Sequence, residues 1–294
     1  MGSMQNFFQT AFSVIILAGL SIGISYGIAH REEYKSKLFA LEHSAAKERA
    51  LAITNLPPLP ETFTDLPVPS TPIDTATTAT VTTATPSYTL DRYYNVVPVN
   101  PGSERKLVLL TIDDVPSTAA TLEPMLATLA AHNVHALFFV IGNQAKAHPE
   151  LIKEIVDGGH TIGNHTWDHA DLKNATNAKS KKEIDDMTTE IEKQTGKKPL
   201  FFRPPYGGSN DYVKKYTAEQ KMVFMTWSLG GEDWVKKYSN AQALTEHVLT
   251  GLAPGANILL HEHPWTRDAL DPIIVGILAK GYTIVDPKDI VTLQ

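Results

Sequence analysis

Residues 107–114 read Leu-Val-Leu-Leu-Thr-Ile-Asp-Asp, and the interpretation of the whole chain starts from them. The residues before the two carboxylates are apolar or β-branched, which is typical of a strand buried on both faces. Two adjacent carboxylates at the end of such a strand repel each other unless they face water or lie near a cation. The stretch therefore predicts either a solvated turn or a cation site.

After this run, short apolar segments alternate with helix-like segments to the end of the chain. We expect strands at residues 107–112, 136–141, 160–163, 200–202, 222–227, 257–260 and 282–285. We expect helices at residues 119–131, 149–157, 181–194, 211–220, 241–252 and 269–279. Strands that alternate with helices predict parallel pairing, and about seven such units favour an α/β barrel over an open sheet.

The N-terminal part of the chain predicts a membrane anchor and a spacer. Residues 1–10 form a short tail, and residues 11–29 are apolar and uncharged over a length that crosses a bilayer as a helix. Residues 30–54 have the pattern of a juxtamembrane helix. Residues 55–105 are rich in Pro and Thr, which predicts a disordered stalk and a lead-in to a folded domain at residues 106–294.

The orientation of this anchor depends on two opposing signals. Arg31, Lys35 and Lys37 follow the span, and the positive-inside rule would place that side in the cytoplasm. The Thr/Pro-rich stalk is instead typical of exported proteins, and we follow it. We expect an extracytoplasmic domain on an uncleaved anchor, with a cleaved signal peptide and secretion as the alternative.

Composition excludes several classes of function. The formal net charge is -6 and no basic stripe is present, which argues against a nucleic-acid partner. The chain contains no cysteine, so it has neither disulfides nor a cysteine nucleophile.

Polar residues follow the predicted strands, where barrel enzymes carry their chemistry. His165 and His169 are four residues apart, so on a helical turn both rings reach one metal ion. With one carboxylate of the Asp113-Asp114 pair, they make a three-ligand site that leaves a position for water. The other carboxylate is then free to accept a proton, which is the arrangement of a metal-dependent hydrolase.

Two further strand ends supply candidate partners. Arg203 is a natural partner for the carboxylate that does not bind the metal, because it would hold that group in position. His261 follows an apolar run and is a candidate general acid, and His263 has the same strand parity.

Five segments together resemble the polysaccharide deacetylases with a NodB homology domain, carbohydrate esterase family four. Residues 111–114 (Thr-Ile-Asp-Asp) resemble the opening motif of that family, and residues 165–169 (His-Thr-Trp-Asp-His) match its H-[ST]-x-x-H motif. Residues 203–207 (Arg-Pro-Pro-Tyr-Gly), 227–234 and 259–261 resemble its remaining motifs. The resemblance covers residues 106–294 in family order.

The resemblance implies a distorted (β/α) barrel and a metal-dependent N- or O-deacetylase. The metal would be Zn²⁺ or another divalent ion such as Co²⁺, Ni²⁺ or Mn²⁺. The implied roles are the base for Asp113, the acid for His261 and the oxyanion contact for the backbone of Tyr206. Asp114, His165 and His169 would bind the metal, Arg203 and Asp233 would support catalysis, and Leu259, Trp234, Pro204 and Pro205 would line the substrate pocket.

Two positions depart from the family pattern. Val115 replaces a glycine after the Asp pair, and a larger side chain there is expected to reshape the mouth of the site or to shift the loop. Gly230 replaces an acid, and its loss is expected to lower the pKa of His261 unless Asp233 or Glu232 takes its place.

The expected function is hydrolysis of N-acetyl groups on a glycan such as peptidoglycan or a chitin-like polymer of N-acetylglucosamine. An O-acetyl polysaccharide esterase and an inactive glycan-binding homologue remain alternatives. A cytoplasmic amidase or deformylase follows if the basic flank sets the orientation.

Overall fold

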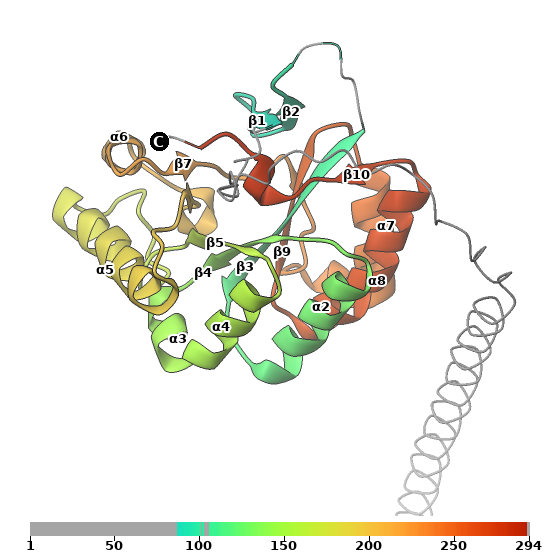
Figure 1. The fold of residues 1–294 in the computed structure, drawn as a ribbon, viewed down its shortest axis with the longest axis horizontal. Helices are drawn as coiled ribbons and strands as arrows, with labels where there is room; N and C mark the ends of the chain where they lie inside the picture. The colour runs from blue at the N-terminus through green and yellow to red at the C-terminus, as the bar shows by residue number, and fades with distance from the viewer. Residues whose placement is uncertain (1–86, 101, 103–105, 293–294) are drawn as a thin grey trace, which may run out of the picture. The chain divides into compact units, whose positions relative to one another are not determined.

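A curled, parallel β-sheet carries helices on its outer face (Figure 1). The structure is a computed structural model, and it describes residues 87–100, 102 and 106–292. The sheet order is β7-β6-β5-β4-β3-β9-β8, and β10 pairs in parallel with the start of β3. The longest strand, β3, therefore lies in the middle and contacts more strands than any other described strand.

The described elements follow one another along the chain as alternating strands and helices. The strands are β1 (Tyr88–Leu90), β2 (Val96–Pro98), β3 (Leu107–Val115), β4 (Leu137–Val140), β5 (Thr161–Asn164), β6 (Phe201–Phe202), β7 (Val223–Phe224), β8 (Leu229–Gly230), β9 (Ala256–His261) and β10 (Thr283–Ile284). The helices are α2 (Ala119–Ala131), α3 (Gly142–Ala147), α4 (Pro149–Asp157), α5 (Asn177–Thr195), α6 (Asp211–Glu219), α7 (Ala241–Gly251) and α8 (Pro264–Ala279), with 3-10 turns η1 (Pro205–Gly207), η2 (Lys236–Tyr238) and η3 (Pro287–Asp289).

Side chains of β3 alternate between two cores. Val108, Leu110 and Ile112 belong to the large apolar cluster between the sheet and the helices. Leu107 and Leu109 belong to a second cluster on the inner face of the curled sheet. Thr111 and Asp113 continue this inner parity and are almost fully buried, so the inner face changes from apolar to polar toward the carboxyl ends of the strands.

The predicted parallel α/β architecture is confirmed, with one correction to the barrel. All seven predicted strands are present, and the two-residue strand β8 is an addition. Within the described residues, β7 and β8 lie at the two ends of the strand order and are not paired with each other. The sheet is therefore curled but open, because no ladder joins its two end strands.

The bounds of two predicted helices, 119–131 and 149–157, agree with α2 and α4. Helix α8 begins at Pro264, earlier than predicted, because proline is favourable in the first turn of a helix. Helix α3 was not predicted. It is one short segment without the apolar periodicity on which the prediction relied.

A small antiparallel hairpin, β1–β2, lies in the segment that was assigned to the lead-in before residue 106. It is bonded to the rest of the fold: Ser87 N donates to Asp289 O, and Val96 N donates to Gly255 O. Val96 is buried in the inner apolar cluster. The described fold thus extends to residue 87.

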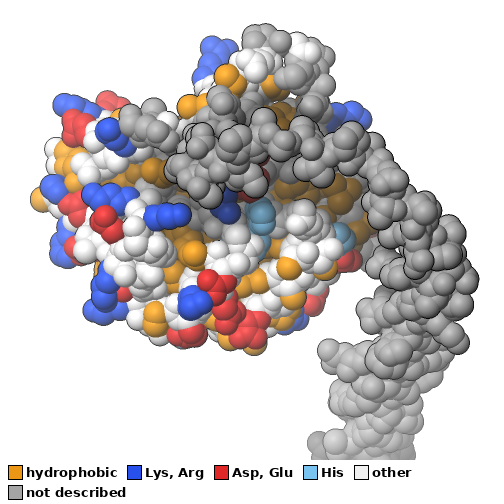
Figure 2. Space-filling model, in the orientation of Figure 1, with side chains coloured by type: hydrophobic (Ala, Val, Ile, Leu, Met, Phe, Trp, Pro, Cys, Tyr) orange, Lys and Arg blue, Asp and Glu red, His pale blue; other side chains and the backbone are white. Residues whose placement is uncertain are grey.

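The predicted tail (1–10), membrane span (11–29), juxtamembrane helix (30–54) and stalk as far as residue 86 lie outside the described residues. Among the residues that the structure describes, no helix has the length and apolarity needed to cross a membrane. On the described part of the face drawn in Figure 2, basic and acidic side chains are interspersed rather than gathered in one stripe.

Candidate active site

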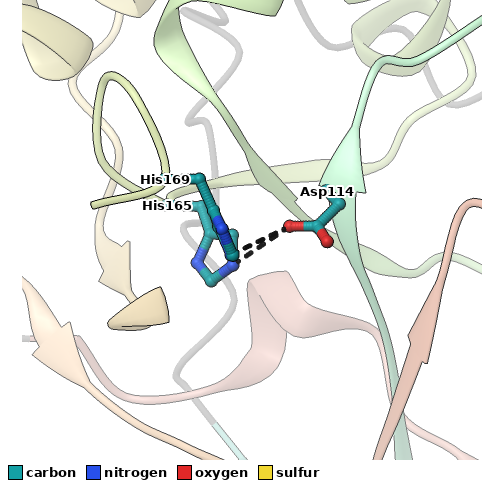
Figure 3. Close-up of side chains that lie close together, drawn as sticks. All are labelled: Asp114, His165 and His169. Carbon is teal, nitrogen blue, oxygen red and sulfur yellow. Dashed lines mark ion pairs between the residues drawn. The ribbon is translucent and has the colours of Figure 1, made fainter. Parts of the chain in front are cut away.

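Asp114, His165 and His169 meet at the carboxyl end of the sheet (Figure 3). Asp114 Oδ1 lies 3.2 Å from His169 Nε2 and 3.5 Å from His165 Nε2. The two imidazole centroids are 5.0 Å apart. The three predicted metal ligands are therefore brought together, each with one ligand atom aimed at a common point.

The backbone places Asp113 and Asp114 in different environments. Strand β3 continues through both residues to Val115, and its register with β4 shifts between Asp113 and Val115. Asp114 is the extra residue of this bulge and has φ 63°. A bulge re-aims a side chain that would otherwise point to the opposite face, and a positive φ is costly for a residue other than glycine.

The loop after β5 holds the two histidines. Glu183 on α5 is buried, and its Oε2 accepts hydrogen bonds from the backbone N–H groups of Trp167 and Asp168. Asn164 Oδ1 accepts from Thr166 N. These bonds fix the chain between the two imidazoles, and His169 itself adopts a positive φ of 55°.

The donor set suits a divalent transition metal. His165 Nδ1 lies 2.7 Å from Arg203 O and must donate to it, which leaves Nε2 with a free lone pair in the neutral ring. Burial lowers the pKa of His169, which keeps it in the neutral, metal-binding form at pH 7. Asp114 Oδ1 is buried and has no hydrogen-bond partner among the described residues. Burial raises the pKa of Asp114, but the neighbouring histidines outweigh it and lower the value to about 2.

Asp113 is held by Arg203. Arg203 Nη1 donates to Asp113 Oδ1 at 2.7 Å and also contacts Thr111 Oγ1, while Nη2 donates to Thr226 O. Arg203 is fully buried, and its guanidinium lies 4.2 Å from the ring centroid of Phe139. Arg203 therefore orients Asp113 and, being fully buried, does not contact a substrate itself.

His261 is hydrogen-bonded to a carboxylate through Nδ1. Its Nδ1 donates to Asp233 Oδ1 at 2.7 Å, and Asp233 Oδ2 accepts from His261 N and Thr266 Oγ1. Burial lowers the pKa of His261, but Asp233 and the carboxylates of the site outweigh it and raise the pKa above the ordinary value. Of the two residues expected to replace the acid missing at Gly230, Asp233 is the one that supports His261.

The second departure from the family pattern, Val115, lies in the core directly after the register shift of β3. Val115 is fully buried in the apolar cluster between the sheet and the helices. Its carbonyl accepts from Ile141 N. The side chain fills the outer core and does not line the mouth of the site.

The predicted pocket residues are unequally exposed. Leu259 is buried on β9 between inward-facing Asn257 and His261, whereas Trp234 is 50% exposed and packs edge-on against His261 at 5.2 Å. Tyr206 is 71% exposed, and its ring packs against His169. Its backbone has a positive φ of 59°. Pro204 and Pro205 are buried and support the turn that carries Tyr206.

Several supporting residues were not predicted. Glu262 is buried, and its two oxygens accept from Ser117 N at 2.6 Å and Thr118 N at 2.9 Å. Its own N–H donates to Asp113 O, so it joins the loop after β3 to the loop after β9. The sequence did contain a signal for Glu183. It lies at helical spacing from Met187 and Ile191 on the core face of α5, and a glutamate on such a face is expected to bind a buried polar group.

The chain is similar to several known proteins. Residues 100–225 match the family model described as polysaccharide deacetylase. The peptidoglycan-N-acetylglucosamine deacetylase PgdA of Listeria monocytogenes is 34% identical over 181 residues, which cover 61% of this chain and 38% of PgdA. The peptidoglycan-N-acetylmuramic acid deacetylase PdaA of Bacillus subtilis is 34% identical over 193 residues, which cover 64% of this chain and 72% of PdaA.

One of the similar solved structures is that of a pseudoenzyme. Wild-type BA3943 of Bacillus anthracis, described as a CE4 family pseudoenzyme, has a TM-score of 0.59 at 30% identity and covers 62% of this chain and 63% of its own. The chain thus spans well under half of PgdA, and its similar proteins include named deacetylases and a pseudoenzyme. Activity must be judged from the residues of the site.

Proposed function

Because this chain belongs to the polysaccharide deacetylase family (carbohydrate esterase family four), we propose that it hydrolyses acetyl groups of an N-acetylated cell-wall polysaccharide in a metal-dependent reaction. One observation carries this proposal. Beside the group formed by Asp114, His165 and His169 lie two neighbours on β3 and β9: Asp113, held by Arg203, and His261, held by Asp233. A glycan-binding module has no need for a held base and a held acid around three metal ligands.

The residues divide the work of the reaction. A divalent metal bound by Asp114, His165 and His169 would polarise the acetyl carbonyl and make a nearby water more acidic. Asp113 accepts the proton of the attacking water. Arg203 occupies Oδ1 of this carboxylate, so Oδ2, 3.7 Å from His165 Nε2, is the oxygen that faces the ligand group and is available for the proton.

The remaining groups act on the developing charge and the leaving group. The N–H of Tyr206 is the proposed donor to the oxyanion, and its positive φ sets the direction of that bond. His261 donates the proton that the departing amine requires. Its Nδ1 is engaged with Asp233, so the proton leaves from Nε2.

Two exposed aromatic rings support a sugar substrate. Tyr206 packs against His169 and Trp234 packs against His261, so both rings border the site, and aromatic faces stack well on sugar rings. PgdA and PdaA are named for deacetylation of peptidoglycan sugars. We therefore favour peptidoglycan N-acetylglucosamine or N-acetylmuramic acid over chitin as the substrate of this chain.

Acetate release tests the proposal. The purified chain with added Zn²⁺ is offered peptidoglycan fragments, N-acetylglucosamine oligomers and acetylated xylan. Release from the amide substrates, and its loss on chelation, is the expected result. Release from xylan alone would assign an O-acetyl esterase, and metal binding without release from any substrate would assign a glycan-binding homologue.

We further propose that residues 11–29 anchor the chain in a membrane with the catalytic domain outside the cytoplasm. The apolar span and the Thr/Pro-rich segment after it support this location. Protease added to intact cells should then degrade the domain, whereas protection until lysis would reverse the orientation.

A further inference from the structure

A second group of metal-ligating side chains lies beside the first. Asp233, His261 and His263 each offer one ligand atom, and these atoms lie within 4.8 Å of one another. Asp233 is fully buried, and the two histidines are partly buried. Two ring nitrogens and one carboxylate oxygen make a donor set that suits Zn²⁺.

His263 has no role in the proposed reaction. It precedes α8, and its ring lies nearly parallel to that of His261, with centroids 5.8 Å apart. Trp265 contacts it from another side at 4.5 Å. Within the residues that the structure describes, its ring nitrogens make no hydrogen bond, whereas Nδ1 of His261 is bonded to Asp233. An unengaged imidazole thus lies next to an Asp–His pair.

We propose that Asp233, His261 and His263 form a second zinc site that inhibits the enzyme. Zn²⁺ replaces the proton on Nδ1 of His261, and that proton passes to solvent. Asp233 Oδ1 changes from hydrogen-bond acceptor to ligand, and one nitrogen of His263 becomes the third ligand. Water completes the coordination, so that charge and protons balance.

The geometry predicts that this site is weaker than the site at Asp114. Ligands about 2.0–2.1 Å from a tetrahedral zinc ion lie roughly 3.3 Å from each other. The Nδ1 and Oδ1 atoms are 2.7 Å apart, so they must separate when zinc enters. Binding also has to displace a proton, and the two hydrogen bonds to Asp233 Oδ2 resist the movement of this carboxylate. We expect affinity at least ~10-fold lower than that of the first site.

The inhibitory consequence rests on the proposed function. With zinc on Nδ1, His261 is a neutral imidazole whose remaining N–H is a far weaker acid than an imidazolium. It no longer delivers a proton to the leaving amine. Zinc would therefore activate the enzyme through the first site and inhibit it through the second.

Metal stoichiometry tests the second site without reference to activity. The full chain, freed of metal and titrated with Zn²⁺ in a calorimeter, is compared with His263→Asn, His263→Ala, His165→Ala and His148→Ala. Asn suits the N-cap position that His263 occupies, so that variant keeps the start of α8, and unfolding curves in chelator verify that each variant folds. His148 is half-exposed at the N-terminus of α4 and serves as the matched control.

The second site predicts that both His263 variants bind one zinc ion fewer than the wild type and that His148→Ala binds the same number. His165→Ala should lose the tighter site and retain the weaker one. Equal stoichiometry in wild type and both His263 variants would overturn the proposal. These outcomes hold whether or not the chain deacetylates any glycan.

Acetate release measured over increasing Zn²⁺ tests the inhibition. The wild type should pass through a maximum and then lose at least ~10-fold in rate, and each His263 variant should keep its own maximal rate. A parallel decline in wild type and His263 variants would place the inhibition elsewhere and refute it.

Discussion

Asp113 and Asp114 are adjacent in sequence, yet the bulge in β3 gives them different partners. Arg203 holds Asp113, and the two histidines face Asp114. The sequence motif pointed to both groups because the His pair and the Asp pair are local patterns. It did not reveal Asn257 or Glu262, whose partners lie far away along the chain.

The division of labour between the carboxylates predicts separable defects. Asp113→Asn should lower kcat by about 10²–10⁴-fold, because the general base is lost, while zinc stays bound. His165→Ala should weaken zinc binding by more than the ~10–100-fold cost of losing an outer-shell partner. Zinc content measured beside turnover distinguishes the two. Equal zinc content in both variants would show that these roles are wrongly assigned.

The Asp233–His261 pair predicts a shift in pH dependence. His261 must be protonated to act as an acid, so activity falls as pH rises through its pKa, which lies above the ordinary value of 6.5. Asp233→Asn removes the charge that raises this pKa. The alkaline limb of the kcat/KM profile should therefore move to lower pH.

The half-buried residue Glu232 supplies the matched control for that experiment. Its carboxylate lies 3.9 Å from His247 Nε2 and is not one of the carboxylates that raise the pKa of His261, so Glu232→Gln should leave the alkaline limb in place. An unchanged limb in Asp233→Asn would mean that another group sets it.

Long elements with regular patterns were predictable and short ones were not. Helix α4 carries a strong apolar stripe at Leu151, Ile152 and Ile155, which explains why its bounds agree with the prediction. Strand β8 contains only Leu229 and Gly230, and no periodicity is measurable over two residues. It forms because its backbone pairs in parallel with β9, which is distant in sequence.

Glu262 links two elements, and its loss should affect both. In Glu262→Gln, the new amide group turns one N–H toward a backbone donor, so one hydrogen bond to Ser117 or Thr118 is lost. The expected loss is about 1–3 kcal/mol of unfolding free energy, or a Tm lower by several degrees. Turnover should fall as well, because the two segments that Glu262 joins directly follow Asp114 on β3 and His261 on β9.

A variant on α2 separates this effect from a general loss of charge. Glu123 is exposed on that helix, so Glu123→Gln should leave both Tm and turnover near the wild-type values. Thermal unfolding of the two variants in chelator makes the comparison without any contribution from metal. Identical unfolding curves for Glu262→Gln and Glu123→Gln would contradict the proposed role of Glu262 in joining the two loops.

At the scale of the whole molecule, metal and folding should be coupled. The ligands come from β3 and from the loop after β5, so a bound ion connects segments that are distant in sequence. Zinc at about 100 times its dissociation constant should add about 2.7 kcal/mol to the stability of the folded state. Thermal unfolding should show a higher Tm with zinc than with chelator in the wild type and a much smaller difference in His165→Ala. A full shift in that variant would contradict binding at this site.

The hairpin β1–β2 determines which side of the fold receives the preceding chain. Ser87 bonds to Asp289 and Val291 bonds to Tyr88, so the polypeptide enters and leaves the fold at neighbouring points. The hairpin bonds to Gly255, which directly precedes β9, through Val96 N. The segment 286–288 contacts the residues before β4 and β5, because Asp286 bonds to His135 and Lys288 bonds to Gly159. Entry and exit therefore lie at the amino ends of the strands, and the ligand group lies at the carboxyl ends. The ligand group thus lies on the face opposite the two ends of the described fold, where an insoluble polymer larger than the enzyme can reach it.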